Sequence, residues 1–242
     1  MKSSLALILL PALLLAACGN KATPLVSGLS GVVADGGVSV DASGKYVVGT
    51  SSWTGGAGKV GLSMAGTAQE LANTTLATDG KFSFAALPTP PEGSLTTAGF
   101  SSASPDCTGT VNISDSKVLG GTLTLNVSAS KSGTIAQVAV NGSDNSLQTL
   151  SPTYVNGPLT INGVQTCSAN GLSVVNDIDV KMTKGWNPVL ISSQVSAAVG
   201  KTTVKTTIRN GSIGTGAKWY LTGSTTQPQG LGSFKLPTSI FR

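Results

Sequence analysis

The chain of 242 residues alternates apolar and polar side chains in several short runs. The clearest of them are residues 38–41, 81–84, 122–127 and 177–182. A period of two sends successive side chains to opposite faces of an extended chain, so each run predicts a β-strand with one buried face. Beyond the N-terminal segment, only residues 64–76 could hold a turn of helix. The pattern therefore predicts an all-β protein.

Turn signals separate these runs. Asp-Gly and Asn-Gly pairs suit two-residue hairpins because both residues tolerate the positive φ angles that such turns need. They begin at Asp35, Asp79, Asn141, Asn156, Asn162, Asn170 and Asn210. Because several of them lie between apolar runs, we expect antiparallel strand neighbours at these places.

A domain boundary is expected close to residue 104. Three prolines between residues 88 and 91 follow one set of strands, and residues 101–105 read Ser-Ser-Ala-Ser-Pro, which is typical of a linker. We therefore predict two sandwich-like antiparallel β domains, residues 28–104 and residues 105–242.

Residues 78–88 read Thr-Asp-Gly-Lys-Phe-Ser-Phe-Ala-Ala-Leu-Pro. This segment resembles the end of carboxypeptidase-regulatory-like and related transthyretin-like β-sandwich modules. The resemblance implies that the Asp-Gly pair makes a turn and that Phe82 and Phe84 fill a core. The glycine-rich residues 53–58 depart from the common pattern. Such modules are structural or carbohydrate-associated, so the resemblance implies a fold and leaves the function open.

The N-terminus has the features of an export signal. A positive charge at Lys2 precedes the mostly apolar residues 5–15, which are too few for the about 20 residues that span a bilayer. The following Leu15-Ala16-Ala17-Cys18 resembles the bacterial lipobox. That resemblance implies a signal peptide of residues 1–17, removed by a dedicated peptidase, and a lipid on the Cys18 sulfur. The alternative is an ordinary signal peptide with an incidental cysteine.

A lipidated Cys18 would begin a short tether, residues 18–27. Two or three acyl chains on one residue hold a protein stably at a membrane. We therefore expect a lipid-anchored protein of the cell envelope, facing away from the cytoplasm. Gly19 stands where an aspartate signals inner-membrane retention in diderm bacteria, which favours the outer membrane. The net charge of +5 is small and scattered, so nucleic acid is not an expected partner.

Two further cysteines, Cys107 and Cys167, form an even pair in a chain expected outside the cytoplasm. Such a pair predicts a disulfide, with Cα atoms about 4.4–6.8 Å apart. The alternative, a reactive thiol, would lack a histidine partner because the chain contains no histidine.

The absence of histidine also excludes His-based triads and His metal sites. Several carboxylates stand at turns, where aspartate is expected for backbone reasons. Asp177 and Asp179 share a strand face, which is either solvated or part of a Ca²⁺ site. Lys201, Lys205 and Arg209 share another, which either contacts an anionic surface or is the wet side of an amphipathic strand. We expect no catalytic residue, no metal and no cofactor.

Three tryptophans, Trp53, Trp186 and Trp219, are candidates for contact with glycan because an exposed indole can stack on a sugar ring. The alternative is that they complete a small core. The main hypothesis is a non-catalytic envelope protein with a structural or interaction role, whose partners are the membrane and other envelope proteins. A module that binds cell-wall glycan is the second hypothesis, and a carboxylate-dependent hydrolase is the third.

Overall fold

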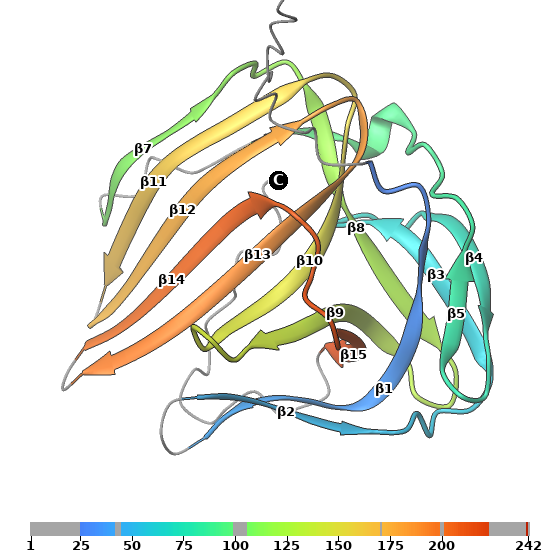
Figure 1. Ribbon diagram of the computed structural model, residues 1–242. Coiled ribbons are helices and arrows are strands. Elements are labelled where there is room, and N and C mark those ends of the chain that lie inside the picture. The colour runs from blue at the N-terminus through green and yellow to red at the C-terminus, as the bar shows by residue number, and fades with distance from the viewer. Residues whose placement is uncertain are drawn as a thin grey trace, which may run out of the picture.

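The computed structural model describes residues 25–41, 45–98, 106–169, 171–198, 201–222 and 241. Almost all of these residues lie in or between β-strands, and the prediction of an all-β protein is confirmed (Figure 1). One short 3-10 helix, η1 (Glu92–Ser94), interrupts the strands. The helical turn considered within residues 64–76 is not formed. Residues 70–76 are a strand instead, because pairing with the neighbouring strand overrides the weak local preference.

The strands in chain order are β1 (Leu29–Val40), β2 (Tyr46–Ser51), β3 (Gly58–Met64), β4 (Glu70–Leu76), β5 (Lys81–Phe84), β6 (Thr96–Thr97), β7 (Cys107–Ile113), β8 (Leu119–Ser128), β9 (Gly133–Asn141), β10 (Ser146–Val155), β11 (Leu159–Ala169), β12 (Leu172–Met182), β13 (Gly185–Ala198), β14 (Lys201–Asn210) and β15 (Lys218–Thr222). Hydrogen bonds join them in the order β2-β1-β15-β9-β8-β10-β13-β14-β12-β11-β7. Strands β3 and β6 pair with β8, β4 pairs with β3, and β5 pairs with β1.

One part of the sheet curves around the first hydrophobic core. Strands β1, β15, β9, β8 and β3 follow each other around this core. Strand β4 pairs with β3 and β5 pairs with β1, so these two strands lie between β3 and β1 (Figure 1). Leu62 and Met64 are fully buried there, and Phe82 and Phe84 also point inward. The two phenylalanines fill the core, as the resemblance of residues 78–88 implied.

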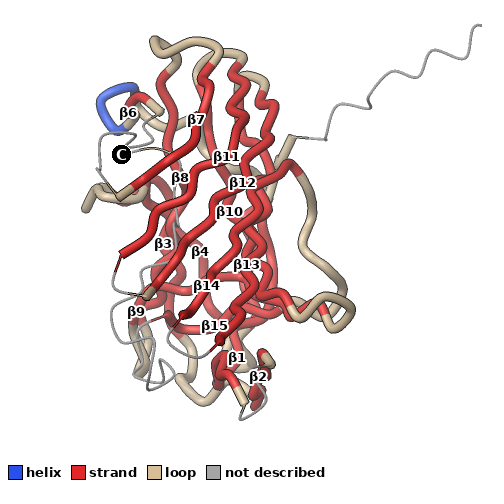
Figure 2. The backbone as a smooth tube through the Cα atoms, turned by 90° about the vertical axis from the view of Figure 1, so that its left-hand side faces the viewer, coloured by secondary structure: helices blue, strands red, loops and turns tan. Residues whose placement is uncertain are grey.

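The other part is a long layer of strands, β10, β13, β14, β12, β11 and β7, which Figure 2 shows side by side. Its buried face forms a second core that includes Ile178, Val180 and Met182 of β12. The alternation in this run is therefore confirmed as a strand with one covered face. Strand β14 lies between β12 and β13. It pairs antiparallel with β13 but parallel with β12, whereas we expected only antiparallel neighbours.

The division into domains of residues 28–104 and 105–242 is not confirmed. Strand β3 pairs with β8 along six residues, and β1 pairs with β15, so hydrogen bonds cross the expected boundary. Leu62 from the first block and Leu125 from the second share one core. The few strands of the first block cannot enclose their own apolar face, and strands from the second block complete that core. The linker-like residues 101–105 lie outside the described residues.

Two of the predicted turns are wrong. Gly36 lies inside β1 and Gly163 inside β11, both with positive φ angles, of 126° and 138°. A side chain at Gly36 would collide with the carbonyl of Gly49, and one at Gly163 with the carbonyl of Thr110. Glycine is therefore required at these points because a partner strand passes close to the backbone, and not because the chain reverses.

Candidate functional site

The predicted disulfide between Cys107 and Cys167 is confirmed. The two residues face each other across the antiparallel pair of β7 and β11, and β7 is an outermost strand of the sheet. Their Cα atoms are 4.0 Å apart, closer than the expected range. Directly opposed residues in an antiparallel pair approach to about 4.5 Å where no hydrogen bonds join them, and this accounts for the short distance. The bond thus ties an edge strand to the sheet.

The three tryptophans are buried, which favours the alternative that they complete a core over the one that they contact glycan. Trp53, Trp186 and Trp219 keep only 6%, 5% and 2% of their surface exposed, and all three belong to the first core. Trp186 packs edge-on against Tyr154, and Trp219 packs edge-on against Phe82. A chain with only 5% aromatic residues uses these rings to fill its interior, which leaves no ring face for a sugar.

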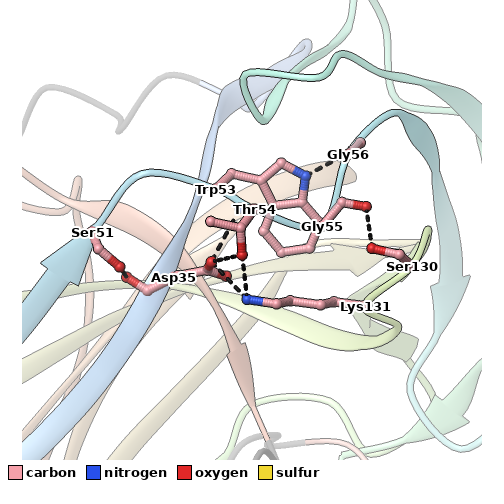
Figure 3. A network of polar contacts seen from close by, with 8 residues as sticks. All are labelled: Asp35, Ser51, Trp53, Thr54, Gly55, Gly56, Ser130 and Lys131. Carbon is pink, nitrogen blue, oxygen red and sulfur yellow. Dashed lines mark hydrogen bonds and ion pairs between the residues drawn. The ribbon is translucent and has the colours of Figure 1, made fainter.

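The most connected polar cluster surrounds Asp35, and we call it the Asp35 network (Figure 3). The Oδ2 atom of Asp35 accepts hydrogen bonds from the Thr54 amide at 3.0 Å, from the Thr54 hydroxyl at 2.5 Å and from the Lys131 ammonium at 2.6 Å. Lys131 also donates to the Thr54 hydroxyl at 2.7 Å and lies over the ring of Trp53, 5.9 Å from its centroid. The network joins β1, the β2–β3 loop and the β8–β9 hairpin.

Neighbouring contacts strengthen this junction. Trp53 donates its indole N–H to the carbonyl of Gly56, and Ser130 donates its hydroxyl to the carbonyl of Gly55 (Figure 3). Ser130 and Lys131 therefore engage different partners. Because a lysine ammonium has no lone pair, it cannot take a proton from the Thr54 hydroxyl. The geometry supports a structural role for the network, which fastens two loops to β1.

Asp35→Asn is expected to lower the free energy of unfolding by about 1 to 2 kcal/mol at neutral pH. It removes charge-assisted hydrogen bonds from the ion pair of Asp35 and Lys131, which solvent screens only in part. Burial of Asp35 opposes ionisation, but the hydrogen bonds from Lys131 and Thr54 outweigh it, so the pKa of the carboxyl lies below its ordinary 3.8. Because its pKa is lower in the folded state than in the unfolded state, the ionised Asp35 carboxylate stabilises the fold above about pH 4. This contribution is lost as the pH falls through the folded-state pKa. Urea unfolding should show the difference between wild type and variant narrowing below about pH 4.

Asp79→Asn is the matched control for this prediction. Asp79 pairs with Lys81 at the same N–O distance, 2.6 Å, but its carboxylate is 52% exposed, compared with 14% for Asp35. Because solvent screens an exposed pair, the control should have the smaller effect on stability. Equal effects of the two substitutions would contradict a special role for the Asp35 network.

The charged strand faces lie where an amphipathic strand puts them. Lys201 and Lys205 of β14 are exposed, whereas Val204 and Ile208 of the same strand are buried. The alternation predicted for residues 201–209 is confirmed, with the lysines on the solvent-exposed face of an amphipathic strand.

Asp177 forms an ion pair with Arg209 on the neighbouring strand. The Arg209 guanidinium donates to the Asp177 carboxylate at 2.8 Å and to the Asp177 carbonyl at 2.7 Å. A carboxylate held by an arginine is a poor starting point for a Ca²⁺ site. Within the part of the chain that the structure describes, no three potential Asp, Glu or Cys ligands cluster around a common point.

One feature that the sequence did not indicate is a cavity of about 270 Å³ where the sheet forks. Strand β8 pairs with β10 up to Thr122 and with β9 from Leu125 onward. Strands β9 and β10 pair with each other only as far as Gln137 and Leu150. The three strands therefore separate, and five residues lie at the opening, namely Leu123, Thr124, Ala136, Ser151 and Pro152. All five line the cavity.

The lining of this fork cavity combines apolar and hydroxyl-bearing side chains. Nine of its residues are apolar, seven are serines or threonines, and none is charged or aromatic. A sequence pattern could not locate it, because the fork arises from three strands that change partners along their length. Pro152 within β10 is a local irregularity at the cavity, since proline has no N–H for a sheet hydrogen bond.

The predicted lipidation site, Cys18, lies outside the described residues. In the ranges that are described, no helix combines the length and the apolar character needed to cross a bilayer. Comparison with protein-family models, with curated proteins and with solved structures found no match for this chain.

Proposed function

We propose that this chain is a bacterial envelope protein, anchored by lipid at Cys18, with a non-catalytic structural or interaction role. The observation that carries the proposal is the N-terminal sequence, in which Lys2, a short apolar run and Leu15-Ala16-Ala17-Cys18 follow each other in the order of a lipoprotein signal. The anchor would hold the β body at a membrane surface, most consistently the outer membrane of a diderm cell.

The disulfide supports export, because such bonds persist in oxidising compartments and are rare in the cytosol. A non-catalytic role is supported by the engagement of the polar groups of the Asp35 network with one another. The Asp35 carboxylate, the Thr54 hydroxyl and the Lys131 ammonium satisfy each other across three segments of the chain. The outward face of the long layer of strands presents neutral and mixed-charge side chains, among them Val164, which is 48% exposed.

Site-specific photocrosslinking in intact cells tests the proposal. A photoreactive amino acid replaces Val164 on β11 or Val47 on β2, both of which are nearly half exposed, and Val180, which is fully buried, serves as the control position. We expect crosslinks to envelope components from an exposed position and none from Val180. Fractionation of the same cells should find the protein with membranes after high-salt washing. Crosslinks to cytosolic proteins only, or turnover of a substrate by purified protein without any envelope partner, would contradict the proposal.

A further inference from the structure

The fork cavity has the properties of a small ligand site. Its volume of about 270 Å³ lies just below the about 300–1,000 Å³ that ligand pockets occupy. Its walls come from several strands, with Thr124 on β8, Ala136 on β9 and Thr149 on β10. Strands in a sheet are rigid supports, and a site on them holds its shape better than a site on loops.

The chemistry of the lining selects for a particular class of molecule. A charged group would lose its hydration here and meet no opposite charge, because none of the lining residues is ionisable. An apolar body would displace water from side chains such as Leu123 and Ile191, which is favourable. The hydroxyls of Thr134, Ser193 and Thr222 already bond to other protein groups. Hydrogen bonds to one or two groups of a ligand would therefore come from hydroxyls such as that of Thr124, which can donate or accept.

A sugar is a poorer fit for the same lining. Sugars present many hydroxyl groups and commonly stack on aromatic rings, and the fork cavity has no aromatic residue. The dominance of apolar residues favours a molecule with few polar atoms.

We propose that the fork cavity binds a small uncharged molecule that has an apolar body and a hydroxyl group, such as a phenol. Binding would be passive, with the apolar body among the leucine and isoleucine side chains and the hydroxyl group on a threonine. The proposal rests on the cavity alone. Evidence against the lipid anchor would leave this proposal unaffected.

Fluorine NMR of the full-length protein in lipid nanodiscs tests the proposal, with 4-fluorophenol as the neutral probe and 4-fluorobenzoate as its charged counterpart. Empty nanodiscs measure the partitioning of each probe into lipid. We expect saturable binding of 4-fluorophenol to the protein and none of 4-fluorobenzoate. An excess of glucose should not displace the phenol. Equal binding of the two probes, or displacement by glucose, would overturn the assignment of ligand class.

Variants assign the binding to the cavity. Ala136→Phe and Thr149→Phe fill it from two strands, and each should weaken 4-fluorophenol binding by about tenfold or more. Thr124→Val removes a hydroxyl at nearly constant shape and should weaken the phenol while leaving fluorobenzene unaffected. Val164→Phe, on the exposed side of β11, is the control and should bind like wild type.

Two filling positions are used because one of the larger side chains can disturb the fold. A variant enters the comparison only if its thermal unfolding is cooperative and its disulfide is intact. Unchanged phenol affinity in a folded Ala136→Phe or Thr149→Phe protein would overturn the proposal, as would the absence of binding to wild type above the empty nanodiscs.

Discussion

Cys18→Ala is expected to abolish incorporation of labelled palmitate and to leave the precursor with its signal uncleaved. The sulfur of Cys18 is the atom that accepts the first lipid in the proposed processing, and alanine offers no such acceptor. Loss of two or three acyl chains removes the membrane attachment that they provide together. Metabolic labelling followed by electrophoresis measures both the label and the size of the chain.

The control for this experiment keeps Cys18 and removes the other two cysteines. Cys107→Ser/Cys167→Ser should take up label like wild type, because both of these thiols are used in the disulfide. Conversion of Cys18 to serine should behave like the alanine variant. Equal labelling of wild type and Cys18→Ala, or no label in either, would remove the lipid anchor from the proposed function.

Cys107→Ser/Cys167→Ser is expected to lower the free energy of unfolding by about 4 kcal/mol. The bond closes a loop across a sequence separation of 60, and the chain-entropy estimate for such a loop has this size. Within the described residues, β7 is hydrogen-bonded to β11 and to no other strand, so without the bond the edge strand depends on that pairing alone. Urea unfolding of purified protein measures the difference.

Two comparisons make this result specific. Wild type under reducing conditions should match the double variant, because both lack the bond. Asn112→Ala removes an exposed side-chain contact between the same two strands, the 3.4 Å hydrogen bond to Asn162, and should cost no more than about 0.5 kcal/mol. Alkylation of native Cys107 without reductant, or a double variant within about 1 kcal/mol of wild type, would contradict the prediction.

The predictions that succeeded were local or depended on a single pair. Alternation around Phe82 and around Val180 requires only that neighbouring side chains point to opposite faces, whatever strands lie beside them. The disulfide followed from cysteine count and expected compartment, without knowledge of the strand order.

The predictions that failed required distant parts of the chain. Asp-Gly at residues 35–36 has the composition of a hairpin turn, but β2 passes beside it, and the positive φ of Gly36 serves that close approach. Trp53 and Trp186 lie in segments with turn-like composition, yet the indole of Trp186 donates to the carbonyl of Pro88, 98 positions away. Local composition cannot distinguish an exposed ring from one that a remote strand covers.

The sequence by itself determined that this protein is built from strands, that two of its cysteines form a pair, and that its N-terminus has the pattern of a lipoprotein signal. Tertiary structure alone decided that residues before and after position 104 share one core, that Asp35 joins Lys131, and that three strands separate around a cavity. The physical reason is that side-chain alternation is a property of neighbouring residues. Strand order and partner exchange depend instead on which remote segments best cover each other's apolar faces.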